Sequence, residues 1–229
     1  MKLVIVADIH ANYEALSSFP ETYDELWVLG DLVNYGADPS AAVDFVRSRA
    51  GVAVRGNHDH AVGYDEDSRC IPRYRAMAEA TRRFTESALT GDQREFLRRL
   101  PIRIEVEREG TRFHLCHAMP SDPLYGYCPR DSDLWVAEVE ATAADVLLVG
   151  HTHTPFVRKI RGRLLVNPGS IGQPKAGKPD ACYAVWENGA VTLKTFPYAV
   201  QRTAAKIDAL PISADVRRDL ISVLRTGSP

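Results

Sequence analysis

The chain has 229 residues, of which 45% are hydrophobic, so it is long enough to bury one large core or two smaller ones. Its 28 basic and 30 acidic residues nearly cancel, which excludes a broad positive surface for nucleic acid or anionic lipid. The longest apolar runs, such as 146–149, are only strand-sized, so we expect no membrane span and a cytoplasmic protein.

The first part of the chain alternates short β-branched runs with helical patterns. Apolar runs predict strands over 3–7, 26–29 and 52–54. Asn12 is placed to cap a helical turn, and Asp38-Pro39 predicts the N-cap and first residue of a helix that stops at Gly51. This alternation is typical of an α/β protein.

Residues 61–100 show helical spacing and many arginines, which predicts a helical insertion with a capping box at Thr90 to Gln93. A further helix is predicted over 133–141. Strand patterns fall at 102–106, 112–115, 146–149, 156–160, 164–166, 183–186 and 191–195.

The last four of these strand patterns resemble an antiparallel meander, with turns at Arg161-Gly162 and Asn188-Gly189. Residues 198–229 look helical again, with Ser213 as a cap. We therefore predict one domain over 1–229, with the insertion at 61–100 and a C-terminal helical tail at 198–229.

Five apolar runs each end in a residue that can bind a metal, and the carboxyl ends of strands converge in open α/β sheets. In extended backbone Asp8 and His10 would leave the same face, as would His151 and His153, and two such pairs imply a shared ion. The candidate ligands are Asp8, His10, Asp31, Asn57, His117, His151 and His153.

The kinds of ligand indicate which metals fit. Carboxylate, imidazole and amide oxygen without thiolate favour Mn²⁺, Fe²⁺, Zn²⁺, Ni²⁺ or Co²⁺ over a structural zinc site. Seven ligands suit two ions with one bridging carboxylate, for which we choose Asp31. Two ions about 3.5 to 4 Å apart clamp the attacking and leaving oxygens of a displacement and produce hydroxide near neutral pH. Their positive charge favours an anionic substrate such as phosphate.

The ordered motifs resemble those of the calcineurin-like metallophosphoesterases, and the resemblance spans roughly residues 3–186. Residues 8–12 and 167–174 look like the small bacterial and archaeal phosphodiesterase branch. The motifs are Asp8-x-His10, Gly30-Asp31, Gly56-Asn57-His58-Asp59, a lone His117 after a strand, and Gly150-His151-Thr152-His153.

The resemblance implies an α/β fold in which two mixed β-sheets pack as a sandwich flanked by helices. It implies that His58 protonates the leaving oxygen or stabilises charge on the phosphoryl group, with Asp59 orienting it. It assigns one metal to Asp8, His10, Asp31 and His153, and the other to Asp31, Asn57, His117 and His151.

A few residues lie near the motifs without belonging to them. Tyr35, Arg55 and Lys175 are candidates for substrate contact, of which we expect at most one to make it, and Ser170 is either a turn residue or a pocket donor. Residues that we interpret as structural or solvated are His60, His114, Arg69, Arg73, Arg75, Arg82 and Arg83.

We expect a phosphodiesterase that uses two divalent ions, Mn²⁺ first, and also accepts phosphomonoesters, with attack by a metal-bridging hydroxide. The partner would be a small phosphorylated, nucleotide-like substrate. Rival enzymes are a dinucleoside-polyphosphate hydrolase and a protein phosphatase. A rival from another class is a non-catalytic interaction scaffold on the same fold, which predicts a degraded site.

Overall fold

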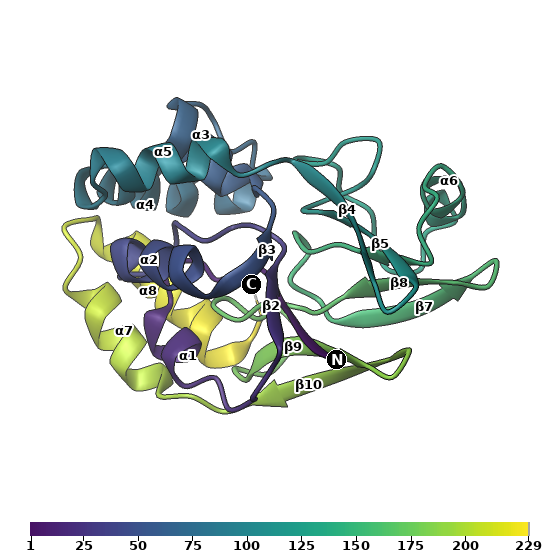
Figure 1. Ribbon diagram of the computed structural model, residues 1–229. Coiled ribbons are helices and arrows are strands. Elements are labelled where there is room, and N and C mark those ends of the chain that lie inside the picture. Colours follow the sequence, from purple (N-terminus) through teal and green to yellow (C-terminus); the bar gives the residue numbers. More distant parts are fainter. Residues whose placement is uncertain (229) are drawn as a thin grey trace.

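The computed structural model describes residues 1–228, which form two five-stranded β-sheets packed face to face (Figure 1). The first sheet has the order β10-β9-β1-β2-β3. In it β1, β2 and β3 run parallel, whereas β9 pairs antiparallel with both β1 and β10. Its strands are β1 (Lys2–Val6), β2 (Glu25–Val28), β3 (Ala50–Ala53), β9 (Ala181–Glu187) and β10 (Ala190–Phe196).

The second sheet has the order β4-β5-β6-β8-β7 and is also mixed. Its three central strands run parallel, and an antiparallel strand lies at each edge. The strands are β4 (Arg103–Arg108), β5 (Thr111–Cys116), β6 (Val146–Leu148), β7 (Phe156–Ile160) and β8 (Arg163–Asn167). The expected sandwich of two mixed sheets with helices outside is therefore confirmed.

Most helices gather on the side of the first sheet, and α6 lies alone beside the second (Figure 1). No helix within residues 1–228 is long and apolar enough to cross a bilayer. The helices are α1 (Tyr13–Ser17), α2 (Pro39–Arg49), α3 (Asn57–Tyr64), α4 (Pro72–Ala88), α5 (Gly91–Arg99), α6 (Leu134–Glu140), α7 (Val200–Asp208) and α8 (Ala214–Thr226).

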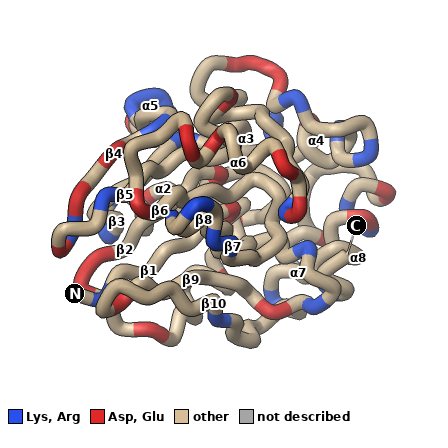
Figure 2. The backbone as a smooth tube through the Cα atoms, turned by 90° about the vertical axis from the view of Figure 1, so that its right-hand side faces the viewer, with Lys and Arg blue, Asp and Glu red and all other residues tan. Residues whose placement is uncertain are grey.

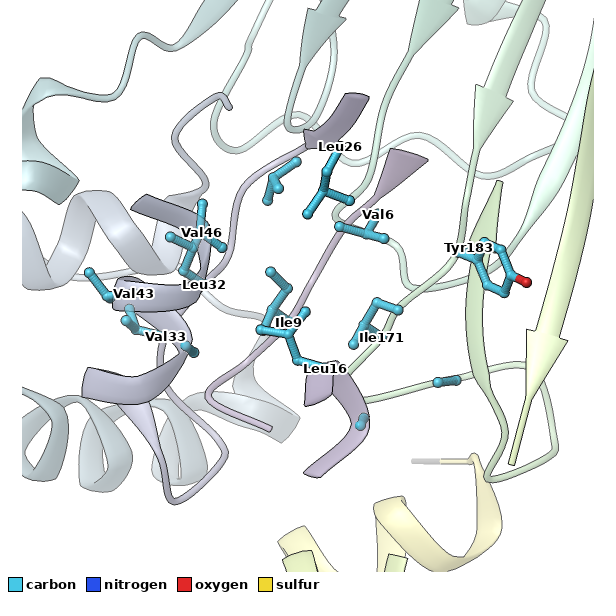
Figure 3. Close-up of a cluster of buried hydrophobic side chains, with 14 of the residues drawn as sticks. Val6, Ile9, Leu16, Leu26, Leu32, Val33, Val43, Val46, Ile171 and Tyr183 are labelled. Atoms are coloured by element: carbon cyan, nitrogen blue, oxygen red, sulfur yellow. The ribbon is translucent and has the colours of Figure 1, made fainter. Parts of the chain in front are cut away.

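Both faces of β1 are buried, which explains its unbroken apolar sequence. Leu3 and Ile5 face the second sheet and share a core with Leu115 of β5. Val4 and Val6 face the other way, into a core that α1 and α2 cover (Figure 3). The first sheet is thus the middle layer of the molecule, with the second sheet packed on one face and helices packed on the other.

Short-range signals predict the local structure well. Asn12, Thr90 and Ser213 each accept a hydrogen bond from a backbone N–H in the first turn of the following helix, as expected of caps. The turns at Gly162 and Gly189 join strand pairs through positive φ angles.

The predicted four-stranded meander is wrong. The hairpin β7–β8 belongs to the second sheet, where β8 pairs parallel with β6, whereas β9–β10 belongs to the first. Turn residues fix which strands form a hairpin but not which strand lies beside it. The chain between β8 and β9 therefore crosses from one sheet to the other.

Positions of basic and acidic residues are interspersed along the backbone in the view of Figure 2. The side chain of Glu21 is mostly buried. Its carboxylate accepts hydrogen bonds from Lys2 of β1, from Lys194 of β10 at 2.9 Å and from Tyr183 of β9 at 2.9 Å. Lys2 first and Lys194 next lower the pKa of Glu21 to about 2. The carboxylate therefore ties three strands of the first sheet together.

We expect Glu21→Gln to lower the free energy of unfolding by about 1–2 kcal/mol at pH 7. The folded pKa lies below the ordinary value of 4.5, so the charged form contributes fully above pH 4.5 and is lost as the pH falls towards 2. Urea unfolding of metal-free wild type and variant at pH 7 and pH 3 checks this, because the difference should shrink at pH 3. The control is Glu95→Gln, an exposed partner of Arg99; an equal loss there, or a pH-independent one, contradicts the prediction.

Candidate metal centre

The carboxyl ends of the strands of both sheets meet at one edge of the sandwich. Asp8 follows β1, Asp31 follows β2 and Asn57 begins α3 just after β3. From the second sheet, His117 follows β5, and the loop after β6 carries both His151 and His153. The expected convergence of strand ends is therefore found, with each sheet supplying part of the site.

Six of these residues form two groups of three, and within each group the potential ligand atoms all lie within 4.8 Å of one another. Asp31 lies between the groups, because its Oδ2 is 3.2 Å from His117 Nε2 and 3.7 Å from His10 Nε2. The first group is Asp8, His10 and His153, and the second is Asp31, His117 and His151.

The ligand loops have left-handed backbone, a conformation that costs of order 1–3 kcal/mol for a non-glycine residue. In residues 1–228 thirteen non-glycine residues have positive φ, and eight of them lie in the loops after β1, β2 and β6. The eight are Asp8, His10, Ala11, Asp31, Asn34, Tyr35, His151 and His153.

The extended backbone assumed for the histidine pair after β6 is therefore wrong. Positive φ at His151 and His153 turns their side chains apart, so that His151 joins the second group and His153 the first. Asp8 and His10 do share a group, although their backbone is not extended either.

Backbone carbonyls fix the orientation of three imidazoles. Nδ1 donates to Val33 O from His10 at 3.0 Å, to Leu29 O from His117 at 2.8 Å and to Gln173 O from His153 at 2.6 Å. In the neutral imidazole each Nε2 then carries the lone pair, as is usual for histidines that bind metals. Burial lowers the pKa of His117, but Asp31 and Asp8 outweigh burial and raise it to about 9, so a cation at this Nε2 would displace a proton.

The ring nitrogens of two histidine pairs lie close to one another. His10 Nε2 lies 3.1 Å from His153 Nε2, and His117 Nε2 lies 3.1 Å from His151 Nδ1. Two nitrogens bound at right angles to one ion, each at about 2.1 Å, would lie about 3.0 Å apart. The spacing of each nitrogen pair therefore fits a shared cation.

Two oxygen atoms also suit cations. Asp8 Oδ1 is buried 3.4 Å from His153 Nε2 and has no hydrogen-bond partner in residues 1–228, a costly arrangement for a carboxylate unless an ion completes it. Asn57 donates from Nδ2 to Ser68 O at 2.8 Å, so its Oδ1 faces His117 Nε2 at 3.0 Å. The donors present fit two divalent ions of the borderline or hard kind.

The loop at 167–174 fixes the backbone of Asp8 through hydrogen bonds to its carbonyl oxygen. Ser170 Oγ donates to the carbonyl of Asp8 at 2.7 Å, so Ser170 is a turn residue rather than a pocket donor. Gly172 N donates to the same carbonyl, and a Cβ at Gly172 would lie 1.7 Å from Ile9 O. Only glycine allows this close approach.

His58 is buried next to the ligand groups and lines a cavity that also borders Asp31, His151 and His153. Burial lowers its pKa, but Cys70 and Asp31 outweigh burial and raise it to about 9. Its Nε2 lies 3.4 Å from Cys70 Sγ, and its Nδ1 lies 2.9 Å from Asn34 Nδ2. A protonated imidazole therefore stands beside the site.

The expectation that Asp59 orients His58 is contradicted. The Asp59 carboxylate accepts from the backbone N–H groups of Asp31 at 2.8 Å, Leu32 at 2.8 Å and Gly56 at 3.0 Å, and so holds the loop that carries Asp31. Asn34 is the residue that contacts His58 Nδ1. Sequence reasoning missed Asn34, although it follows Gly30-Asp31 closely.

A cavity of about 400 Å³ opens over the metal-ligand groups. Tyr35 lines it, with its ring centroid 4.7 Å from those of His10 and His58. Arg55 does not line it, because its guanidinium donates to Arg98 O at 2.6 Å and to Tyr64 at 3.1 Å. The structure therefore places Tyr35, but not Arg55, where a substrate would bind.

The remaining residues near the motifs also divide into those at the cavity and those outside it. His60 stacks on Tyr64, and His114 contacts Glu105 at 3.3 Å, so both lie outside the two groups. The cavity is also lined by Lys175, Arg69 and Arg73. The two arginines are exposed, as a solvated face predicts, but they border the cavity, which the spacing of the basic residues does not predict.

Comparison with known proteins gives a consistent result. The model of the calcineurin-like phosphoesterase superfamily domain matches residues 1–189. An uncharacterised protein of Methanocaldococcus jannaschii is 31% identical, covering 99% of this chain and 93% of its own length. Phosphodiesterase YfcE of Escherichia coli is 25% identical, covering 84% of this chain and 91% of its own.

Solved structures share the fold. A metallophosphoesterase from Sphaerobacter thermophilus matches with a TM-score of 0.82 at 27% identity, covering 99% of both chains. A protein from Pyrococcus horikoshii matches with a TM-score of 0.84 at 20% identity, covering 99% of this chain and 98% of its own. The whole described chain, including α7 and α8, thus has the arrangement of these structures.

Proposed function

The chain belongs to the calcineurin-like phosphoesterase superfamily, and from this premise we propose that it is a dinuclear-metal phosphoesterase that hydrolyses phosphodiesters and, as a second class, phosphomonoesters. The observation that carries the proposal is the pair of ligand groups with Asp31 between them. One ion would be held by Asp8, His10, Asp31 and His153, and the other by Asp31, Asn57, His117 and His151.

When bound, two divalent cations supply Lewis-acid charge for the phosphoryl oxygens and lower the pKa of a water towards neutrality. The protein's own part is to hold the ligands, orient the phosphoryl group and deliver a proton. The inventory of ligands suits Mn²⁺ first, with Fe, Zn, Ni or Co as further candidates.

His58 is the proposed proton donor to the leaving oxygen. As an imidazolium His58 carries a proton on both ring nitrogens, and its Nε2 lies 3.4 Å from Cys70 Sγ, a residue that also lines the cavity. A pKa of about 9 keeps the proton of Nε2 in place near neutral pH. An interaction scaffold on this fold has no use for such a group, which favours an enzyme over that rival.

Metal removal tests the proposal. Protein stripped with a chelator should lose hydrolysis of bis-p-nitrophenyl phosphate, and Mn²⁺ should restore it, because the proposed attack needs water whose pKa the ions lower. The measurements are initial rates and elemental analysis of the reloaded protein, for which about two ions per chain are expected. Full activity without metal would overturn the metal mechanism, and inactivity of the fully loaded protein towards diesters and monoesters would favour the scaffold.

A further inference from the structure

Besides the protonated His58, one lysine and two arginines line the cavity, and these three have no carboxylate partner in residues 1–228. They are Lys175, Arg69 and Arg73, and Asp31 is the only acidic residue among the lining residues. Other arginines of the same helical segment are paired: Arg82 with Asp65 and Glu86, and Arg83 with Glu79. Arg75 of the same helix also lacks a carboxylate within 4.0 Å in residues 1–228 but does not line the cavity, so Arg69 and Arg73 are distinguished by their position at the cavity.

Aromatic rings hold two of these cations in place. Lys175 Nζ lies 4.2 Å from the ring centroid of Tyr74, and the Arg69 guanidinium lies 4.4 Å from that of Tyr125. Cation–π contacts position a charge without neutralising it. The cations therefore remain available to an anion that enters the cavity.

The charges of the metal-ligand groups and of Arg73 both act on the pKa of Lys175. Burial lowers its pKa to about 8, Asp8 opposes that effect and Arg73 adds to it. Gathering like charges in a partly desolvated cavity costs energy, which an anionic ligand would offset. A chain whose overall charge is only −2 thus places three basic side chains around this cavity.

The cavity is larger than one phosphoryl group requires. Its volume of about 400 Å³ lies within the range of roughly 300–1,000 Å³ for small-molecule pockets, and a single phosphate would fill only a small part of it. Tyr127 also lines it, with 63% of its surface exposed, and offers a free aromatic face.

We propose that Lys175, Arg69 and Arg73 form a second anion subsite, so that the substrate is a nucleotide-type phosphoester carrying a further phosphate beside the one that is hydrolysed. This proposal rests on the proposed phosphoesterase function. The second phosphate would bind the three cations, and the nucleoside would span the cavity between the subsites.

Two substrates with the same scissile bond test the subsite: thymidine 5′-(p-nitrophenyl phosphate) with and without a 3′-phosphate. Wild type should prefer the 3′-phosphorylated compound in kcat/KM, mainly through KM. Lys175→Met and Arg73→Gln should each lower that preference by about 10-fold, the effect of losing a charge-assisted contact. The exposed Arg73 is the second variant because its substitution does not disturb packing, and Arg83→Gln on the same helix is the matched control.

Each outcome decides between the possibilities. An unchanged preference, or an equal loss on both substrates, overturns the subsite, and the latter would place Lys175 at the scissile phosphate. If metal-loaded wild type hydrolyses no phosphoester, the proposed function fails by itself. The subsite is then judged by calorimetric binding: thymidine 3′,5′-bisphosphate should bind about 10-fold tighter than thymidine 5′-phosphate, and Lys175→Met should remove the difference.

Discussion

Replacing Asp31 with alanine will lower kcat/KM for bis-p-nitrophenyl phosphate by about 10³-fold or more and will weaken binding of both ions. The reason is the position of Asp31 Oδ2, which lies within 3.7 Å of a histidine nitrogen of each ligand group. Burial opposes ionisation of Asp31, but His117 and His58 hold its pKa well below the usual range, so it is charged and ready to bind cations.

The measurement is elemental analysis after dialysis against limiting metal, together with initial rates. His153→Ala is the matched comparison, because His153 belongs to one group only and should lose one ion rather than two. An Asp31→Ala protein that keeps two tightly bound ions would show that Asp31 is not the bridge.

Replacing His58 with asparagine will lower kcat by about 10²- to 10⁴-fold while both ions stay bound. The loss should be larger for a dinucleoside monophosphate than for a p-nitrophenyl ester, because a poor leaving group depends more on a proton from Nε2. His58 itself is in neither ligand group, so metal content should not change. Rates on the two substrates and elemental analysis measure both effects.

Two further variants make the assignment specific. Asn34→Leu should give a smaller loss of kcat, because the imidazole remains but its Nδ1 contact at 2.9 Å is removed. His60→Gln, which changes the other histidine of α3, should leave kcat unchanged. Loss of metal from the His58→Asn protein would make His58 a ligand, and equal losses on both substrates would argue against proton donation.

The fold was predictable where the signal is local. Both-sided burial of β1 shows as an unbroken apolar run, and the turns at Gly162 and Gly189 mark their hairpins. The placement of those hairpins in different sheets was not predictable, because it depends on the pairing of β8 with β6 and of β9 with β1. Such partners lie far along the chain, and no local pattern encodes them.

The candidate site was likewise predictable in its residues but not in all of their contacts. Ligand types at strand ends predicted which residues converge, since the carboxyl ends of parallel strands share one edge. The actual contacts of Asp59 and Asn34 were not predictable, because left-handed backbone after β2 decides which side chain reaches His58. Nor could spacing along a helical segment separate Arg73, which lines the cavity, from Arg83, which pairs with Glu79 on the surface.

The division of the ligands between two sheets has a consequence for the order of assembly. Asp8 and His10 come from the first sheet, whereas His153, which completes their group, comes from the second. A nascent chain that has not yet produced β6 and its loop therefore has no complete group, and neither sheet alone encloses an ion. Metal binding must therefore follow docking of the two sheets. The bound ions stabilise the folded protein after its strands have paired and do not direct that pairing.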